Sequence, residues 1–160
     1  MTPQEMKTRA QEIFTQRMHC SQAVLTAGQE KLNRVNYDII RAVGAFGGGF
    51  AGTGKVCGCV VGAIALISSV YCKSRPEEKE DPHFWRLGRG LVQEFEKLTE
   101  SYGGICCRDI AGVDWNNRDQ VKQYYSGADG RWQRCKDVVG ETARLLGEIL
   151  EGIETSLPVS

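Results

Sequence analysis

The sequence has little of what a nucleic-acid-binding domain needs. Its 160 residues carry twenty Lys and Arg against twenty Asp and Glu, so the formal net charge is zero. A nucleic-acid-binding domain of this size usually carries a basic excess. The three tryptophans also show no stacking pattern with basic residues. We therefore expect no nucleic-acid partner.

Long hydrophobic runs are also missing. The longest uncharged stretch is residues 56–72, which includes two glycines and two serines. It is shorter than the roughly 20 apolar residues that cross a bilayer. We therefore predict a buried helix there and no membrane span. Residues 1–14 are charged and amphipathic and lack the apolar core of a signal peptide, which predicts a cytoplasmic protein.

Short cysteine motifs and histidines are scarce as well. The chain has no C-x-x-C-H motif, which excludes covalent c-type haem, and no C-x-x-C motif, so any disulfide pair must join distant segments. Its only histidines are His19 and His83. His83 lies in a charged stretch and is expected at the surface. His19, beside Cys20, is the better candidate for a ligand or a proton donor.

Helical periodicity is the main structural signal, because no segment alternates apolar and polar residues over a strand's length. Thr2 and Glu5 form a capping box at the first helix. The residues between 19 and 21 form either a break between two helices or part of one long helix, and Ser21 as a cap favours the break. We predict an all-α fold, a single-domain bundle of five or six helices over residues 1–160. The helical patterns cover about 3–17, 21–32, 37–46, 54–71, 81–98 and 130–151, with one short helix near 119–125.

Glycines cluster before the helix predicted from residue 54. Residues 49–56 read G-F-A-G-T-G-K-V, which is close to a phosphate-binding loop. Val56 has no oxygen for a metal ion, and a helical pattern precedes the loop where that motif needs a strand. We interpret the segment as a connection between helices. Gly58 and Gly62 then share one helix face, which predicts the close approach of another helix.

Seven cysteines are many for a cytoplasmic chain. In a reducing compartment clustered thiols favour metal binding or redox chemistry over structural disulfides. The alternative is that several are small buried hydrophobic residues, which we favour for Cys59, Cys72 and Cys106. A disulfide between the neighbours Cys106 and Cys107 is rare and is not expected.

Four of the cysteines fall near predicted helix starts, where the helix dipole favours a thiolate. Cys59 lies two residues after Cys57, roughly 200° further round a helix, so it is predicted to face elsewhere. The long gaps between the four give no local metal-site signature. The four are Cys20, Cys57, Cys107 and Cys135.

Four segments together resemble the C_GCAxxG_C_C family of redox-active proteins. The resemblance implies a redox role, by iron–sulfur binding or by thiol–disulfide exchange. The family has alanine where this chain has Cys59, which we expect to be a neutral replacement; the alternative is that Cys59, like His19, is an additional ligand. The resemblance assigns the signature thiols to Cys20, Cys57, Cys107 and Cys135. The segments are H-C-S-Q-A-V-L (19–25), G-T-G-K-V-C-G-C-V-V-G-A (52–63), C-R-D-I (107–110) and R-C-K-D-V-V (134–139).

Three functions follow as hypotheses. In the favoured one, the four signature thiolates bind an iron–sulfur cluster, or less favourably zinc, for electron transfer or redox sensing with an unidentified partner protein. In the second, no cofactor is bound and two thiols cycle through a disulfide, with Cys57 as the nucleophile and Cys135 as the other catalytic cysteine. In the third, the protein is a structural or partner-binding helical protein whose cysteines are merely buried.

Overall fold

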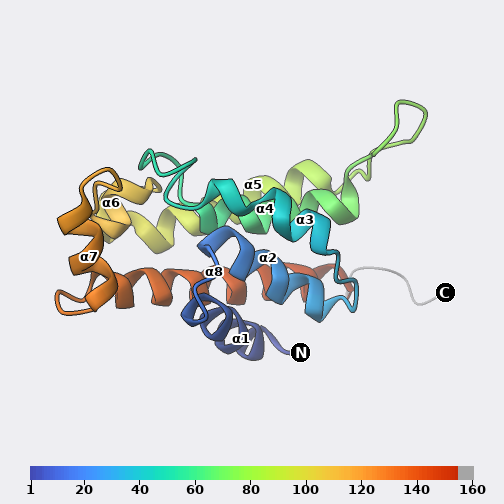
Figure 1. Ribbon diagram of the computed structural model, residues 1–160. Coiled ribbons are helices and arrows are strands. Elements are labelled where there is room, and N and C mark those ends of the chain that lie inside the picture. Colours follow the sequence, from blue (N-terminus) through green and yellow to red (C-terminus); the bar gives the residue numbers. More distant parts are fainter. Residues whose placement is uncertain (155–160) are drawn as a thin grey trace.

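The structure is a computed structural model that describes residues 1–154, so residues 155–160 of the predicted domain lie outside the described part. Within residues 1–154 it contains eight α-helices, two 3-10 turns and no strand (Figure 1). The α-helices are α1 (Pro3–Thr15), α2 (Cys20–Lys31), α3 (Tyr37–Ala42), α4 (Gly58–Tyr71), α5 (Phe84–Thr99), α6 (Cys107–Ala111), α7 (Arg118–Ser126) and α8 (Arg131–Glu154), and the turns are η1 (Gly44–Phe46) and η2 (Glu100–Tyr102).

The all-α fold class is confirmed, but the predicted number of five or six helices is wrong, since the described residues form eight. The helix without a predicted counterpart is α6, whose five residues are too few to show a hydrophobic period. Short helices depend on local caps and on packing rather than on propensity. The side chain of Asn36 accepts from two amides at the start of α3, and that of Asn117 does the same for α7. Gly112, at φ 63°, ends the five-residue α6.

The predicted break between the first two helices is confirmed, with a different cap. The amide of Arg17 still bonds back to the α1 carbonyl of Phe14, but Arg17 has a φ of 70°, which turns the chain away from α1. His19 is the residue that precedes α2, and its amide donates to the Gln22 side chain at 3.2 Å. Ser21 lies inside α2, where its buried hydroxyl donates to the carbonyl of Val43 at 2.8 Å. Ser21 therefore ties α2 to the segment after α3 and does not cap a helix.

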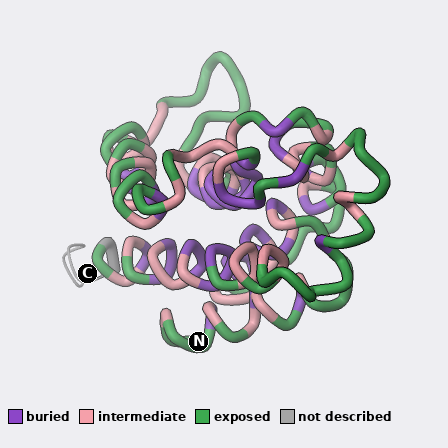
Figure 2. Tube along the Cα trace, turned by 90° about the vertical axis from the view of Figure 1, so that its left-hand side faces the viewer, coloured by how far each residue is buried: buried purple, intermediate pink, exposed green. Residues whose placement is uncertain are grey.

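The long helix α8 organises the packing. It lies against α1, α2, α4, α5 and α6, while α2 also packs on α4 (Figure 1). Buried residues line the inner faces of these helices, and exposed residues cover the outer faces (Figure 2). Full burial of one such large apolar side chain contributes about 1.5–3 kcal/mol. The largest fully buried apolar side chains include Phe95, Met6, Leu25, Leu66 and Leu146.

The predicted close approach along the glycine face of α4 is confirmed, and its partner is α2. A Cβ atom placed on Gly62 would overlap the backbone carbonyl of Ser21. On the opposite helix, a Cβ on Gly28 would overlap the Leu66 side chain of α4. A glycine on each helix therefore allows the other helix to pack closely against it.

The uncharged stretch at 56–72 forms α4, which packs against α2 and α5. Seven of its residues are buried, so the expected buried helix is confirmed. Among the described residues, none of the helices has both the length and the apolar character to cross a membrane.

Candidate thiol site

The glycine-rich loop at residues 47–56 connects η1 to α4 and fixes the start of α6. Six of its residues have positive φ, including the non-glycines Phe50 and Ala51. The Cys107 amide donates to the carbonyl of Lys55 at 2.7 Å, and the Arg108 amide donates to that of Gly54 at 3.0 Å. The interpretation as a connection between helices therefore holds, and the loop also brings the start of α6 against the start of α4.

Cys57 is the residue before α4 and is not part of the helix. Its backbone is extended, with φ −60° and ψ 133°, and α4 begins at Gly58, later than predicted. The helical angle between Cys57 and Cys59 therefore does not apply. The prediction that Cys59 faces elsewhere is wrong, because Cys59 lines the same small cavity as Cys57 and Cys20.

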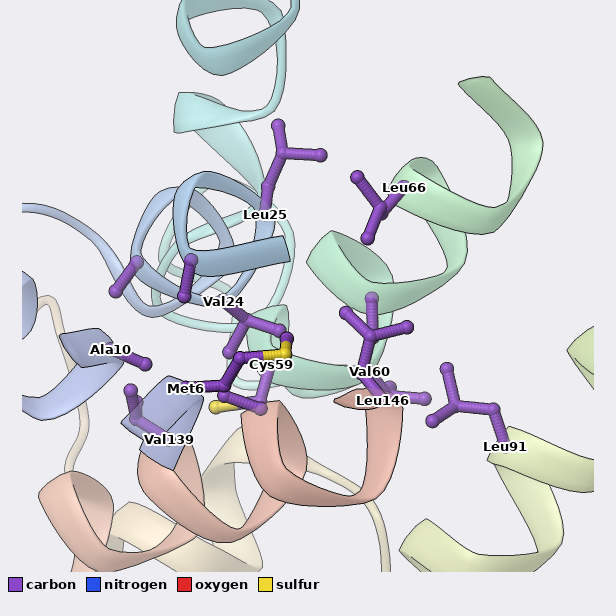
Figure 3. Packing of buried hydrophobic residues seen from close by; sticks show 14 of the residues in the cluster. Met6, Ala10, Val24, Leu25, Cys59, Val60, Leu66, Leu91, Val139 and Leu146 are labelled. Carbon is purple, nitrogen blue, oxygen red and sulfur yellow. The ribbon is translucent and has the colours of Figure 1, made fainter. Parts of the chain in front are cut away.

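Gly58 makes room for the sulfur of Cys20. A Cβ atom on Gly58 would lie 2.6 Å from Cys20 Sγ, far inside van der Waals contact. Cys20 is the first residue of α2, so the close α2–α4 contact carries its sulfur between Cys57 and Cys59. Cys59 belongs to the main hydrophobic cluster together with Met6 and Val24 (Figure 3).

These three thiols ionise differently. Hydrogen bonds from the thiols of Cys57 and then Cys59 hold the pKa of Cys20 well below its ordinary value, and the Ser21 amide and the charge of His19 act in the same direction. The pKa values of Cys57 and Cys59 are raised well above the ordinary value, first because each must keep its proton to donate to Cys20 and further because of burial. Of the three thiols, Cys20 therefore loses its proton most readily.

The other two thiols are held in the protonated form. Burial raises the pKa of Cys107, the first residue of α6, to about 11. Burial likewise raises the pKa of Cys135, near the start of α8, to about 12, against a hydrogen bond with the Tyr124 hydroxyl. A helix start alone therefore does not make these two cysteines reactive.

One small cavity connects the five thiols. Its volume is about 50 Å³, and its wall includes four aromatic side chains, Phe14, Trp115, Tyr124 and Tyr125. His19 and Tyr125 belong to the wall and are also exposed to solvent, so they mark its opening. The structure thus brings all four signature cysteines and Cys59 to one place. The thiols in the wall are Cys20, Cys57, Cys59, Cys107 and Cys135.

The two remaining cysteines lie elsewhere. Cys72 is exposed at the end of α4, with its sulfur 3.5 Å from a carboxylate oxygen of Glu80. Cys106 is half-buried and precedes α6. All seven cysteines lie in the described range and are free thiols, so Cys106 and Cys107 are not bridged.

The donor set suits a soft metal centre, but its arrangement does not fit one. Thiolates are the usual ligands of iron–sulfur clusters and of structural zinc. Within residues 1–154, however, no group of three or more His, Cys, Asp or Glu side chains is arranged to hold a metal ion. The cavity that the sulfurs line also has room for only a few water molecules.

Fold and site together define a small all-α protein that gathers free thiols around one cavity. The sequence profile of a family described as "Putative redox-active protein (C_GCAxxG_C_C)" matches residues 18–149, so the chain belongs to this family. The family resemblance carried by the cysteine segments is thereby confirmed. No curated protein and no solved structure matched the chain.

Sequence reasoning missed two residues of the site. Trp115 lies in a turn-rich segment, and Tyr124 lies on the short helix expected near 119–125. Each contacts a cysteine on another element, Trp115 with Cys107 and Tyr124 with Cys135. No local pattern marks such contacts, because they arise only when α6, α7 and α8 pack together.

Proposed function

We propose that the protein is a two-electron thiol–disulfide redox protein in which Cys20 is the reactive thiolate and Cys57 its partner. The observation that carries this proposal is that Cys20, Cys57 and Cys59 line one cavity, with the Cys20 sulfur against Gly58, the residue between the other two cysteines. The thiolate, not the thiol, is the nucleophile. The lowered pKa of Cys20 and the raised pKa of Cys57 therefore favour Cys20 as the nucleophile. The catalytic pairing of Cys57 with Cys135 expected from the sequence stays a prediction.

The proposed cycle uses no bound cofactor. Two thiols become one disulfide, which releases two electrons and two protons to a two-electron oxidant such as a disulfide or a hydroperoxide. The Cys20 thiolate first attacks the oxidant and expels its leaving group. Cys57 then attacks the modified Cys20 sulfur and closes the Cys20–Cys57 bond. Cys59, which also contacts Cys20, is the alternative resolving thiol.

Equilibration with dithiothreitol redox buffers tests this proposal. The reduced protein is held for hours at a series of reduced-to-oxidised ratios, trapped with a maleimide and mapped by mass spectrometry. We expect two thiols to be lost together and a peptide crosslinked through Cys20 to appear. Cys72→Ser should keep this crosslink and Cys20→Ser should lose it. Seven free thiols at every ratio would contradict the proposal and favour merely structural cysteines.

Iron–sulfur binding is the second candidate, because five thiols line one cavity. The sulfurs of Cys20, Cys57 and Cys59 would have to move apart to hold a cluster. Purification without oxygen, followed by assays for iron and acid-labile sulfide, tests it directly. Cys135→Ala separates the two candidates, since it should remove a cluster yet leave a disulfide between Cys20 and Cys57. A colourless, iron-free protein would exclude this candidate.

A further inference from the structure

We propose that the oxidant of this thiol centre is a small hydroperoxide, hydrogen peroxide first of all, and that disulfide oxidants of protein or glutathione size are excluded from it. This inference rests on the proposed thiol–disulfide function and names the co-reactant. It comes from the burial of the sulfurs, the size of the cavity and the chemistry of its wall.

Access to the sulfurs is restricted for a bulky oxidant. Cys57 and Cys59 are 5% and 2% exposed. Cys20 is half-buried, with its sulfur against Gly58 in the α2–α4 contact. Exchange with a disulfide proceeds through a mixed disulfide, so a substituted sulfur must reach the attacking thiolate. Such a molecule could reach Cys20 only if α2 or the loop at residues 47–56 first moved away from α4.

The cavity admits small molecules instead. Its volume of about 50 Å³ matches a few water molecules, and hydrogen peroxide has only two heavy atoms. The opening beside Tyr125 is held by packing. The Arg17 guanidinium lies 4.5 Å from the centre of the Tyr125 ring, and the Tyr124 and Tyr125 rings meet edge to face at 5.0 Å.

The wall also favours an uncharged oxidant. Its described residues are thiols, aromatic and aliphatic side chains, glycines and His19, with no Asp, Glu, Lys or Arg among them. A charged molecule would lose hydration there, and His19 is the one wall residue that could pair with an anion. Hydrogen peroxide is neutral, whereas oxidised glutathione carries several carboxylates.

The reaction balances with hydrogen peroxide alone. The Cys20 thiolate attacks one peroxide oxygen, the O–O bond breaks, and the products are the Cys20 sulfenic acid and hydroxide. The Cys57 sulfur then attacks the Cys20 sulfur, the S–O bond breaks, and water leaves as the disulfide forms. The proton of Cys57 and one from solvent convert the departing oxygens to water. Two electrons pass from the two sulfurs to the peroxide.

The test compares oxidants on the reduced full-length chain. Hydrogen peroxide, cumene hydroperoxide and oxidised glutathione are added separately without oxygen, and differential alkylation with mass spectrometry follows Cys20. Exposed Cys72 in the same molecule supplies the reference rates. For each cysteine we compare the rate of oxidation by hydrogen peroxide with the rate by oxidised glutathione. We expect this rate ratio to be about 100-fold larger at Cys20 than at Cys72, because oxidised glutathione reaches Cys20 only after local opening of the fold. Cumene hydroperoxide should also be slow at Cys20.

A widened opening should change this selectivity. Tyr125→Ala removes a ring from the wall and should raise the rate of cumene hydroperoxide at Cys20 about tenfold, with little change for hydrogen peroxide. The matched control is Tyr37→Ala, since Tyr37 is 75% exposed on α3 and is not part of the wall. In Cys57→Ser/Cys59→Ser, hydrogen peroxide should leave a Cys20 sulfenic acid, which dimedone traps once the protein is unfolded.

The possible results distinguish a failure of the hydroperoxide inference from a failure of the proposed thiol–disulfide function. Equal preference at Cys20 and Cys72 would overturn the hydroperoxide inference, while a Cys20 disulfide in the dithiothreitol titration would leave the redox function standing. That titration runs to equilibrium over hours, so slow local opening does not prevent it. Absence of the Cys20 disulfide in both experiments would overturn both. The comparison of oxidants on the wild-type chain tests the hydroperoxide inference even if a variant fails to fold.

Discussion

At the scale of single residues, the neighbours of a sulfur decide its chemistry more than its place on a helix. Cys20 and Cys57 both lie at the start of a helix of at least twelve residues. Only Cys20 has a lowered pKa, because it accepts hydrogen bonds where Cys57 donates one. The sequence predicted that Cys20 and Cys57 lie near helix starts, although α4 begins later than predicted, and it could not show which sulfurs meet.

Cys59 allows a direct test of this view. Cys59→Ala removes one of the two thiols that donate to Cys20, so the pKa of Cys20 should rise and its alkylation by iodoacetamide at pH 7 should slow several-fold. The fold should survive, with the free energy of unfolding lowered by about 1 kcal/mol for the lost buried sulfur. Mass spectrometry of the alkylated Cys20 peptide measures the rate, and urea unfolding measures the stability.

Cys72→Ala is the control for that experiment, since Cys72 is exposed and outside the cavity. In this variant the alkylation of Cys72 should disappear, while the rate at which iodoacetamide alkylates Cys20 stays constant. An unchanged Cys20 rate in Cys59→Ala would mean that Cys59 does not support the thiolate, and that its sulfur serves packing alone.

At the scale of elements, the sequence predicted the close-packing glycines of α4 but not the helix that packs against them. The spacing of Gly58 and Gly62 predicted a close helix contact, which α2 provides. The sequence does not indicate which helix packs against which. The contact between the Cys20 sulfur and Gly58 therefore could not be predicted. For the same reason the short helix α6, which holds Cys107, was not predicted, whereas the short helix expected near 119–125 is α7, which holds Tyr124.

Two glycine-to-alanine substitutions separate crowding from helix propensity. In Gly62→Ala the new methyl group overlaps the carbonyl of Ser21, and the free energy of unfolding should fall by about 1–3 kcal/mol or more. In Gly90→Ala, within α5, the methyl group meets nothing within 4 Å, and stability should rise by about 0.5–1 kcal/mol. Urea unfolding monitored by circular dichroism compares the two.

Because Gly62 faces the residue that follows Cys20, its substitution also reports on the site. Separation of α2 from α4 should remove the Cys20 sulfur from its two thiol neighbours, so a folded Gly62→Ala should alkylate at Cys20 with a changed pH dependence. Gly90→Ala should alkylate as the wild type does. Equal stability of the two variants would contradict the close contact between α2 and α4.

At the scale of the whole molecule, the site exists only through the tertiary fold. Its thiols come from α2, the residues at the start of α4, α6 and α8. The sequence separations between them carry no local signature, so spacing alone did not predict a cluster, whereas the family resemblance did group the four signature cysteines. Cys59 was kept only as a possible extra ligand because its position was judged on an ideal helix that includes Cys57, whereas α4 begins one residue later, at Gly58.

The buried thiols should make the protein less stable at alkaline pH. In the unfolded chain a cysteine loses its proton near pH 8.5, whereas native Cys107 and Cys135 keep theirs to about pH 11 and about pH 12. Above pH 8.5 the native state therefore binds more protons than the unfolded state, and the free energy of unfolding falls as the pH rises. Each such thiol contributes a slope of about 1.4 kcal/mol per pH unit.

Urea unfolding at pH 8, 9 and 10 in a phosphine reductant measures that slope. Cys20 acts in the opposite direction, but its stabilising contribution is complete once the unfolded cysteine has ionised, so it adds no slope above pH 9. Cys135→Ala should lower stability at pH 8 and yet flatten the slope between pH 9 and 10 by about 1.4 kcal/mol per unit, whereas Cys106→Ala, outside the cavity, is the control. An unchanged slope in Cys135→Ala would mean that this sulfur reaches solvent and ionises in the native protein, in which case the cavity is open to larger oxidants as well.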